Sequence, residues 1–137
     1  MSVPVSLLAR LMITMATIAY GVGPFITDMN KTHLLHPGWT GHARFHLFWA
    51  ASSQLAVASV ALWLLWGAGG LQQCQLAVYL GLAMNSGFFA ALLFKKYYRG
   101  ALHDPQGIRP ILGKIDGNIL AVIAIVALLL AGWGCLD

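Results

Sequence analysis

Four long apolar runs dominate this sequence and limit what it can fold into. They cover approximately residues 5–26, 45–66, 71–94 and 115–133. About 20 apolar residues in a helix cross the roughly 30 Å hydrocarbon core of a bilayer. The runs are continuous and lack the alternation typical of membrane strands, and a span in lipid must satisfy its own backbone hydrogen bonds. We therefore expect an all-α integral membrane protein, a four-transmembrane-helix bundle that forms a single domain over residues 1–137.

The composition agrees with this reading. The chain is 59% hydrophobic and only 9% charged, which is more apolar surface than one small water-soluble core could hide. The first run is not a typical signal peptide, because its early charge, Arg10, lies inside the apolar stretch and no small-x-small cleavage site follows. We interpret it as a helix of the mature protein.

The basic residues predict an orientation. The first connection holds two Lys or Arg and the third holds five, out of eight in the chain. With four spans these connections share one side, which should be cytoplasmic because Lys and Arg accumulate in cytoplasmic loops. Both termini are then non-cytoplasmic. This topology accounts for the net charge of +4, and nothing in the sequence suggests a nucleic-acid partner.

The two cysteines test the same topology. Cys74 begins the third run and Cys135 follows the fourth, so both should lie near the non-cytoplasmic face. An oxidising compartment would permit a disulfide there. Two free thiols packed as small hydrophobic groups are the alternative.

Two residues predict local helix boundaries in the first half of the chain. Pro24 lacks a backbone donor and clashes with the preceding turn, so the first helix should kink or stop there. Thr40 is a suitable N-cap for the second helix, which should begin near Gly41.

Four of the five histidines occur between residues 33 and 46, and they suggest a metal site. His42 and His46 are four apart and share one helix face. Together with His33, His36 and Asp28 they could bind one divalent transition metal, zinc or iron, or copper. Membrane di-iron desaturases and hydroxylases are excluded, because as a class they need eight or more histidines.

General acid/base chemistry is the second interpretation of these residues. Histidine titrates near neutrality, and a carboxylate beside it could orient the ring for proton transfer to a substrate. The candidate catalytic residues are His42, His46, Asp28 and Asp116, with His103 as an outer contributor. Asp116 could instead pair with Lys114 or Arg109 at the headgroup level.

Polar residues continue from the histidines into the apolar runs. Trp49 and Ser53 extend the His42–His46 face, while Gln54 and Asn85 lie nine and ten residues inside their spans, near the bilayer midplane. The two amides could bond to each other across helices or form the floor of a cavity. We therefore treat Trp49, Ser53, Gln54 and Asn85 as candidate substrate-pocket residues.

The layout resembles that of the EXPERA group, the emopamil-binding sterol isomerases and sigma-2 receptor-like proteins. The likeness lies in a first span ending in Asp28, a loop with His, Pro and Trp, and a second span reading FHLFWAASSQLAVASVALWLLWG. It implies a helical bundle around a sterol-sized pocket in which acid residues and His handle a cationic ligand or intermediate. The chain departs from that group in having no Glu and in the predicted side of its termini, and no EXPERA site residue maps onto it.

These features predict a small integral membrane enzyme acting on a lipophilic small molecule, through either a metal or general acid/base catalysis by the His/Asp cluster. The alternative is a non-catalytic membrane subunit, or a lipid- or ligand-binding protein, whose cluster docks a partner or a headgroup. The expected partners are membrane lipid and a lipophilic small molecule, and a homo-oligomer is compatible with the sequence.

Overall fold

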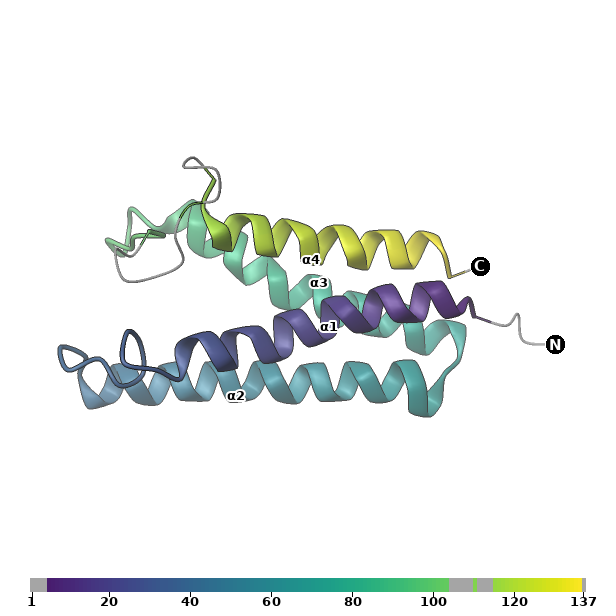
Figure 1. The fold of residues 1–137 in the computed structure, drawn as a ribbon, viewed down its shortest axis with the longest axis horizontal. Helices are drawn as coiled ribbons and strands as arrows, with labels where there is room; N and C mark the ends of the chain where they lie inside the picture. The colour runs from purple at the N-terminus through teal and green to yellow at the C-terminus, as the bar shows by residue number, and fades with distance from the viewer. Residues whose placement is uncertain (1–4, 104–109, 111–114, 137) are drawn as a thin grey trace.

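The computed structural model describes residues 5–103, 110 and 115–136, and its regular elements in these ranges are helices. The four long helices are α1 (Leu7–Asp28), α2 (Gly41–Trp63), α3 (Leu71–Phe94) and α4 (Gly117–Gly134), and a π-helical turn, η1 (Leu64–Ala68), extends α2 (Figure 1). Each of the four is long and apolar enough to cross a membrane. The four predicted helices are confirmed: α3 has the expected bounds, and the ends of the other three differ from the expected runs by one to four residues.

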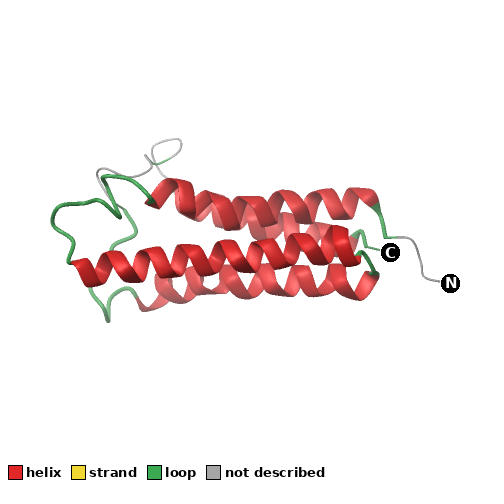
Figure 2. Cartoon of the chain, turned by 90° about the horizontal axis from the view of Figure 1, so that it is seen from below, coloured by secondary structure: helices red, strands yellow, loops and turns green. Residues whose placement is uncertain are grey.

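The helices run alternately up and down, so both termini lie at the same end of the bundle (Figures 1 and 2). We call this the terminal end, and we call the opposite end, where residues 29–40 and 95–103 lie, the loop end. Helix α1 contacts all three other helices, most extensively α4 and α2. The first helix is therefore the central packing element.

Side-chain caps begin three of the helices. Ser6 accepts from the Ala9 N–H at 3.4 Å, and Thr40 accepts from the Ala43 N–H at 3.2 Å. The predicted N-cap at Thr40 and the start of α2 at Gly41 are confirmed. Asp116 accepts from the Asn118 N–H at 2.8 Å, so this carboxylate satisfies a backbone donor of α4.

Helix α1 continues past Pro24 and ends only at Asp28, so of the two outcomes expected at the proline, a kink or a stop, the stop does not occur. The physical reason is the position of the proline near the helix end. Proline removes one donor, which leaves the Tyr20 carbonyl without a partner from residue 24. Only one further turn follows, so few other hydrogen bonds depend on regular geometry at this point.

Small residues bring the helices close together. A Cβ placed on Gly21 of α1 would overlap the Ala58 side chain of α2, and one on Gly132 of α4 would lie 2.6 Å from an Ile13 side-chain carbon of α1. Packing of this kind is typical of apolar helices, which associate through close contact of small residues. Because α1 packs closely against both α2 and α4, a glycine lies at each of these two interfaces.

The terminal end is the densely packed half of the bundle. Ala9, Ile13, Leu65, Cys74 and Leu129 are all fully buried there. Cys74 and Cys135 both lie at this end as free thiols, so of the two states the sequence allowed, the unpaired one is present. Towards the loop end the α1/α2 pair and the α3/α4 pair diverge (Figure 1).

Arg10 ties α1 to the end of α2. Its guanidinium donates to the Leu65 carbonyl at 2.8 Å and also to the Gly69 carbonyl. The guanidinium carbon lies 5.7 Å from the centre of the Trp66 ring, and the Trp66 indole N–H donates to Thr14 at 2.9 Å. A cation thus satisfies carbonyls that the helix end leaves free, where the helix dipole also favours positive charge.

Candidate ligand cavity

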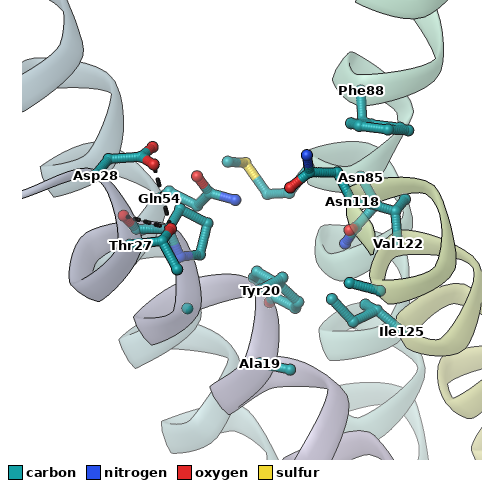
Figure 3. A pocket seen from close by; sticks show the side chains of 14 residues that line it. Ala19, Tyr20, Thr27, Asp28, Gln54, Asn85, Phe88, Asn118, Val122 and Ile125 are labelled. Carbon is teal, nitrogen blue, oxygen red and sulfur yellow. Dashed lines mark hydrogen bonds between the residues drawn. The ribbon is translucent and has the colours of Figure 1, made fainter. Parts of the chain in front are cut away.

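The main functional candidate is a cavity of about 420 Å³ that all four helices line on the loop-end side. Each helix contributes at least one polar side chain to its wall: Thr27 and Asp28 from α1, Gln54 from α2, Asn85 from α3 and Asn118 from α4 (Figure 3). Apolar residues such as Met84, Phe88 and Ile125 complete the lining. A mostly apolar hollow with a few polar groups is the usual form of a small-molecule site.

Among the residues that the structure describes, Asp28 is the only carboxylate that lines the cavity, and no Lys, Arg or His lines it. The carboxylate accepts a hydrogen bond from the Thr27 hydroxyl at 3.2 Å, and the same hydroxyl lies 3.4 Å from the Pro24 carbonyl. A partly buried carboxylate attracts positive charge and hydrogen-bond donors. The cavity is therefore suited to a ligand with a cationic or donating group.

The two amides predicted near the midplane, Gln54 and Asn85, lie on opposite walls of this cavity (Figure 3). Asn85 is buried, with only 6% of its surface exposed, and its amide donates to the Gly81 carbonyl at 2.8 Å. That bond is made within α3, so it does not join Asn85 to Gln54. The sequence allowed either a bond between the two amides or a cavity lined by them. The placement of Gln54 and Asn85 corresponds to the second interpretation.

Tyr20 lies at the base of the cavity, and sequence reasoning missed it. Its side chain is 1% exposed, and its hydroxyl has no hydrogen-bond partner within the part of the chain that the structure describes. A signal was present, because residues 20, 24, 27 and 28 follow the spacing of a single helix face and all line the cavity. Asn118, at the start of α4, was also missed, since an amide next to a loop attracts no attention in a hydropathy reading.

The four clustered histidines lie outside the cavity. On α2, the Nε2 atoms of His42 and His46 are 3.0 Å apart, both side chains are exposed, and His46 stacks on Trp49 with ring centres 5.8 Å apart. In the loop, the His33 ring bonds to the Thr32 hydroxyl at 2.8 Å. His36 accepts from the Gly38 N–H at 3.1 Å.

The expected ligand set of His33, His36, His42, His46 and Asp28 therefore does not converge. Within the described ranges, no three His, Cys, Asp or Glu side chains are grouped so that they could hold a metal ion. The reason is local: the two loop imidazoles are held by turns of residues 30–40, while the α2 pair faces outwards and Asp28 faces the cavity.

The other candidate residues are also away from the cavity. Asp116 caps α4, and His103 is exposed in the segment after α3. Trp49 is 58% exposed and Ser53 is exposed, although both had been expected to line a pocket. Ser53 and Gln54 are neighbours in sequence, and successive helical residues differ by about 100° in direction, so only one of them can face the bundle interior.

The fold and the cavity define a class: a bundle of four apolar helices with a polar-walled hollow near one end. The model of a family of unknown function, DUF6640, matches residues 12–136, and the chain belongs to this family. Comparison with curated proteins and with solved structures produced no match.

Proposed function

We propose that the chain is a multi-pass integral membrane protein. Its helices carry many exposed apolar side chains, among them Leu8, Ile26 and Leu93, which are each at least 58% exposed. Trp49 and Trp66 lie 17 positions apart along α2 and η1, or about 26 Å at 1.5 Å per residue. Tryptophans favour the two membrane interfaces, and this spacing suits the hydrocarbon thickness of a bilayer.

In this arrangement the loop end is cytoplasmic and both termini are non-cytoplasmic, as the excess of Lys and Arg at the loop end predicts. His42 and His46 precede Trp49 and so reach the headgroup layer. A membrane-impermeant thiol reagent on sealed cells tests this in a Cys74→Ser, Cys135→Ser background. A cysteine introduced at Lys31 should stay protected, while one at Gln72 should react; the reverse pattern would overturn the orientation.

The function that the cavity supports best is binding of a lipophilic small molecule that carries a cationic group. The observation that carries the proposal is Asp28, which is the one charged side chain among the described residues that line the cavity; the others carry amides, hydroxyls or apolar groups. An apolar body fits against residues such as Phe88 and Ile125, and the cation meets the carboxylate. This is the kind of pocket that the resemblance to the EXPERA group implies.

Titration of the purified protein in detergent micelles tests the proposal, with octadecylamine and octadecanoic acid as matched probes. The wild type should bind the amine and not the acid, and Asp28→Asn should lose binding of the amine. Asp116→Asn removes a carboxylate outside the cavity and is the control that should bind like the wild type. Equal binding of both probes, or full binding by Asp28→Asn, would overturn the assignment.

A catalytic version is the second candidate, because Asp28 is also an ionisable group in direct contact with the cavity. In that version Asp28 transfers the proton, and the histidines do not contact the substrate. Molecules extracted from the purified protein and compared by mass spectrometry distinguish the two. An enzyme predicts that Asp28→Asn accumulates a different molecule, whereas a binding protein predicts that the same molecule is lost.

A further inference from the structure

The polar groups of the cavity are divided between two walls. Asp28 and Gln54 belong to the α1/α2 wall, and Asn85 and Asn118 belong to the α3/α4 wall (Figure 3). The close contact of Gly21 with Ala58 gives the relative depth of Asp28 and Gln54 along the bundle. Gln54 is four positions from Ala58 and Asp28 is seven from Gly21, so their depths differ by about 4–5 Å.

The amides need partners of their own. Asn85 is more than nine-tenths buried, and its bond to the Gly81 carbonyl uses only one of its two N–H groups. In Figure 3 the Asn85 carbonyl oxygen points across the cavity towards the side of Gln54. Each amide therefore presents hydrogen-bonding capacity to whatever occupies the space.

A simple amine does not complement both walls. An ammonium group at Asp28 satisfies the carboxylate, but the alkyl chain attached to it would cover the cavity amides, Gln54 and Asn85 among them, with hydrocarbon. Covering a buried polar group without a hydrogen bond is costly, whereas a hydroxyl can donate to an amide oxygen and accept from an amide N–H. A head that carries both an amine and hydroxyls a few ångströms away meets the carboxylate and the amides together.

We infer that the cavity selects long-chain amino alcohols over simple long-chain amines, with Asn85 and Gln54 as the residues that determine this specificity. The inference rests on the proposed function, in which Asp28 binds the cation. Asp28 supplies the charge recognition common to both ligand classes. The amides on the opposing walls supply the discrimination, because they lose hydrogen bonds to solvent when the ligand carries no hydroxyl.

Sphinganine and octadecylamine test this as probes, since both have an 18-carbon chain and one primary amine. Sphinganine carries two further hydroxyls, on carbons 1 and 3, and its amine is on carbon 2. In the micelle titration, the wild type should bind sphinganine about tenfold or more tightly, the effect of one or two good hydrogen bonds. In Asn85→Leu and in Gln54→Leu the ratio should fall towards one, while octadecylamine binding is kept. Gln72→Leu removes an amide from the terminal end of α3 and should leave the ratio unchanged.

The failures of the two proposals are distinguishable. If the wild type binds both probes equally, or if the ratio survives in both cavity variants, the amino-alcohol inference is wrong while the amine site at Asp28 stands. If the wild type binds neither probe, both proposals fall. Retained octadecylamine binding in Asn85→Leu also shows that the variant is folded, so a lost preference cannot be an effect of unfolding.

Discussion

Replacement of Arg10 should destabilise the bundle. The guanidinium makes hydrogen bonds to the Leu65 and Gly69 carbonyls and lies over Trp66. A hydrogen bond to a charged group contributes about 1.5–3 kcal/mol, and we use the lower value because Arg10 is only half-buried. Two such bonds and a cation–π contact of about 0.5 kcal/mol suggest a loss of about 3–4 kcal/mol in Arg10→Leu.

A loss of this size should lower the unfolding temperature by about 10 °C in a chain of this length. Cys74 reports unfolding directly, because it is a fully buried free thiol. In a Cys135→Ser background, the temperature at which a thiol-reactive fluorophore labels Cys74 gives the midpoint. Arg10→Lys should lose roughly half as much, since an ammonium keeps the charge but lacks the planar fork that reaches both carbonyls.

Lys31→Leu is the control, because Lys31 is exposed in the loop-end connection. It should stay close to the wild-type midpoint. If Arg10→Leu also unfolds at the wild-type temperature, the bonds from Arg10 to the end of α2 contribute nothing measurable, and the reasoning about this helix end is refuted.

Three further changes have defined expectations. Tyr20→Phe removes a buried hydroxyl that has no partner among the described residues, so the unfolding temperature should stay the same or rise. A fall equivalent to about 1 kcal/mol or more would mean that the hydroxyl has a partner. Gly21→Val places side-chain atoms where the Ala58 methyl lies and should lower stability by about 1–3 kcal/mol. Gly23→Val should cost less, because its first side-chain carbon meets open space. Equal unfolding midpoints for the two variants would contradict the close contact. His42→Ala with His46→Ala should leave octadecylamine binding unchanged, and a large loss of affinity in the titration would place the pair in the site.

Much of the architecture follows from the sequence. The four helices come from continuous apolar runs of sufficient length, and hydropathy is a property of neighbouring residues along the chain. The start of α2 is equally local, because Thr40 caps an N–H only three positions away. The helix does not stop at Pro24 for a reason that is local too: a proline in the final turns removes one bond and leaves the others in place.

The candidate site followed from the sequence only in part. Asp28, Gln54 and Asn85 were identified as unusual polar residues at the end of or inside apolar runs, and all three line the cavity. The histidine cluster was expected to join them because its members are close in sequence. Closeness in sequence does not decide which way a side chain faces, and the local turns and the outward face of α2 direct the imidazoles elsewhere.

The sequence by itself determined that this chain forms four apolar helices, where α2 begins, and which polar residues its spans must accommodate. Only the tertiary structure decided that Asp28 and the amides of three other helices share one hollow, and that the terminal end closes while the loop end opens. The physical reason is that helix rotation and separation depend on contacts between distant residues. Gly21 lets α1 approach α2, and nothing in the local pattern of either helix specifies that contact.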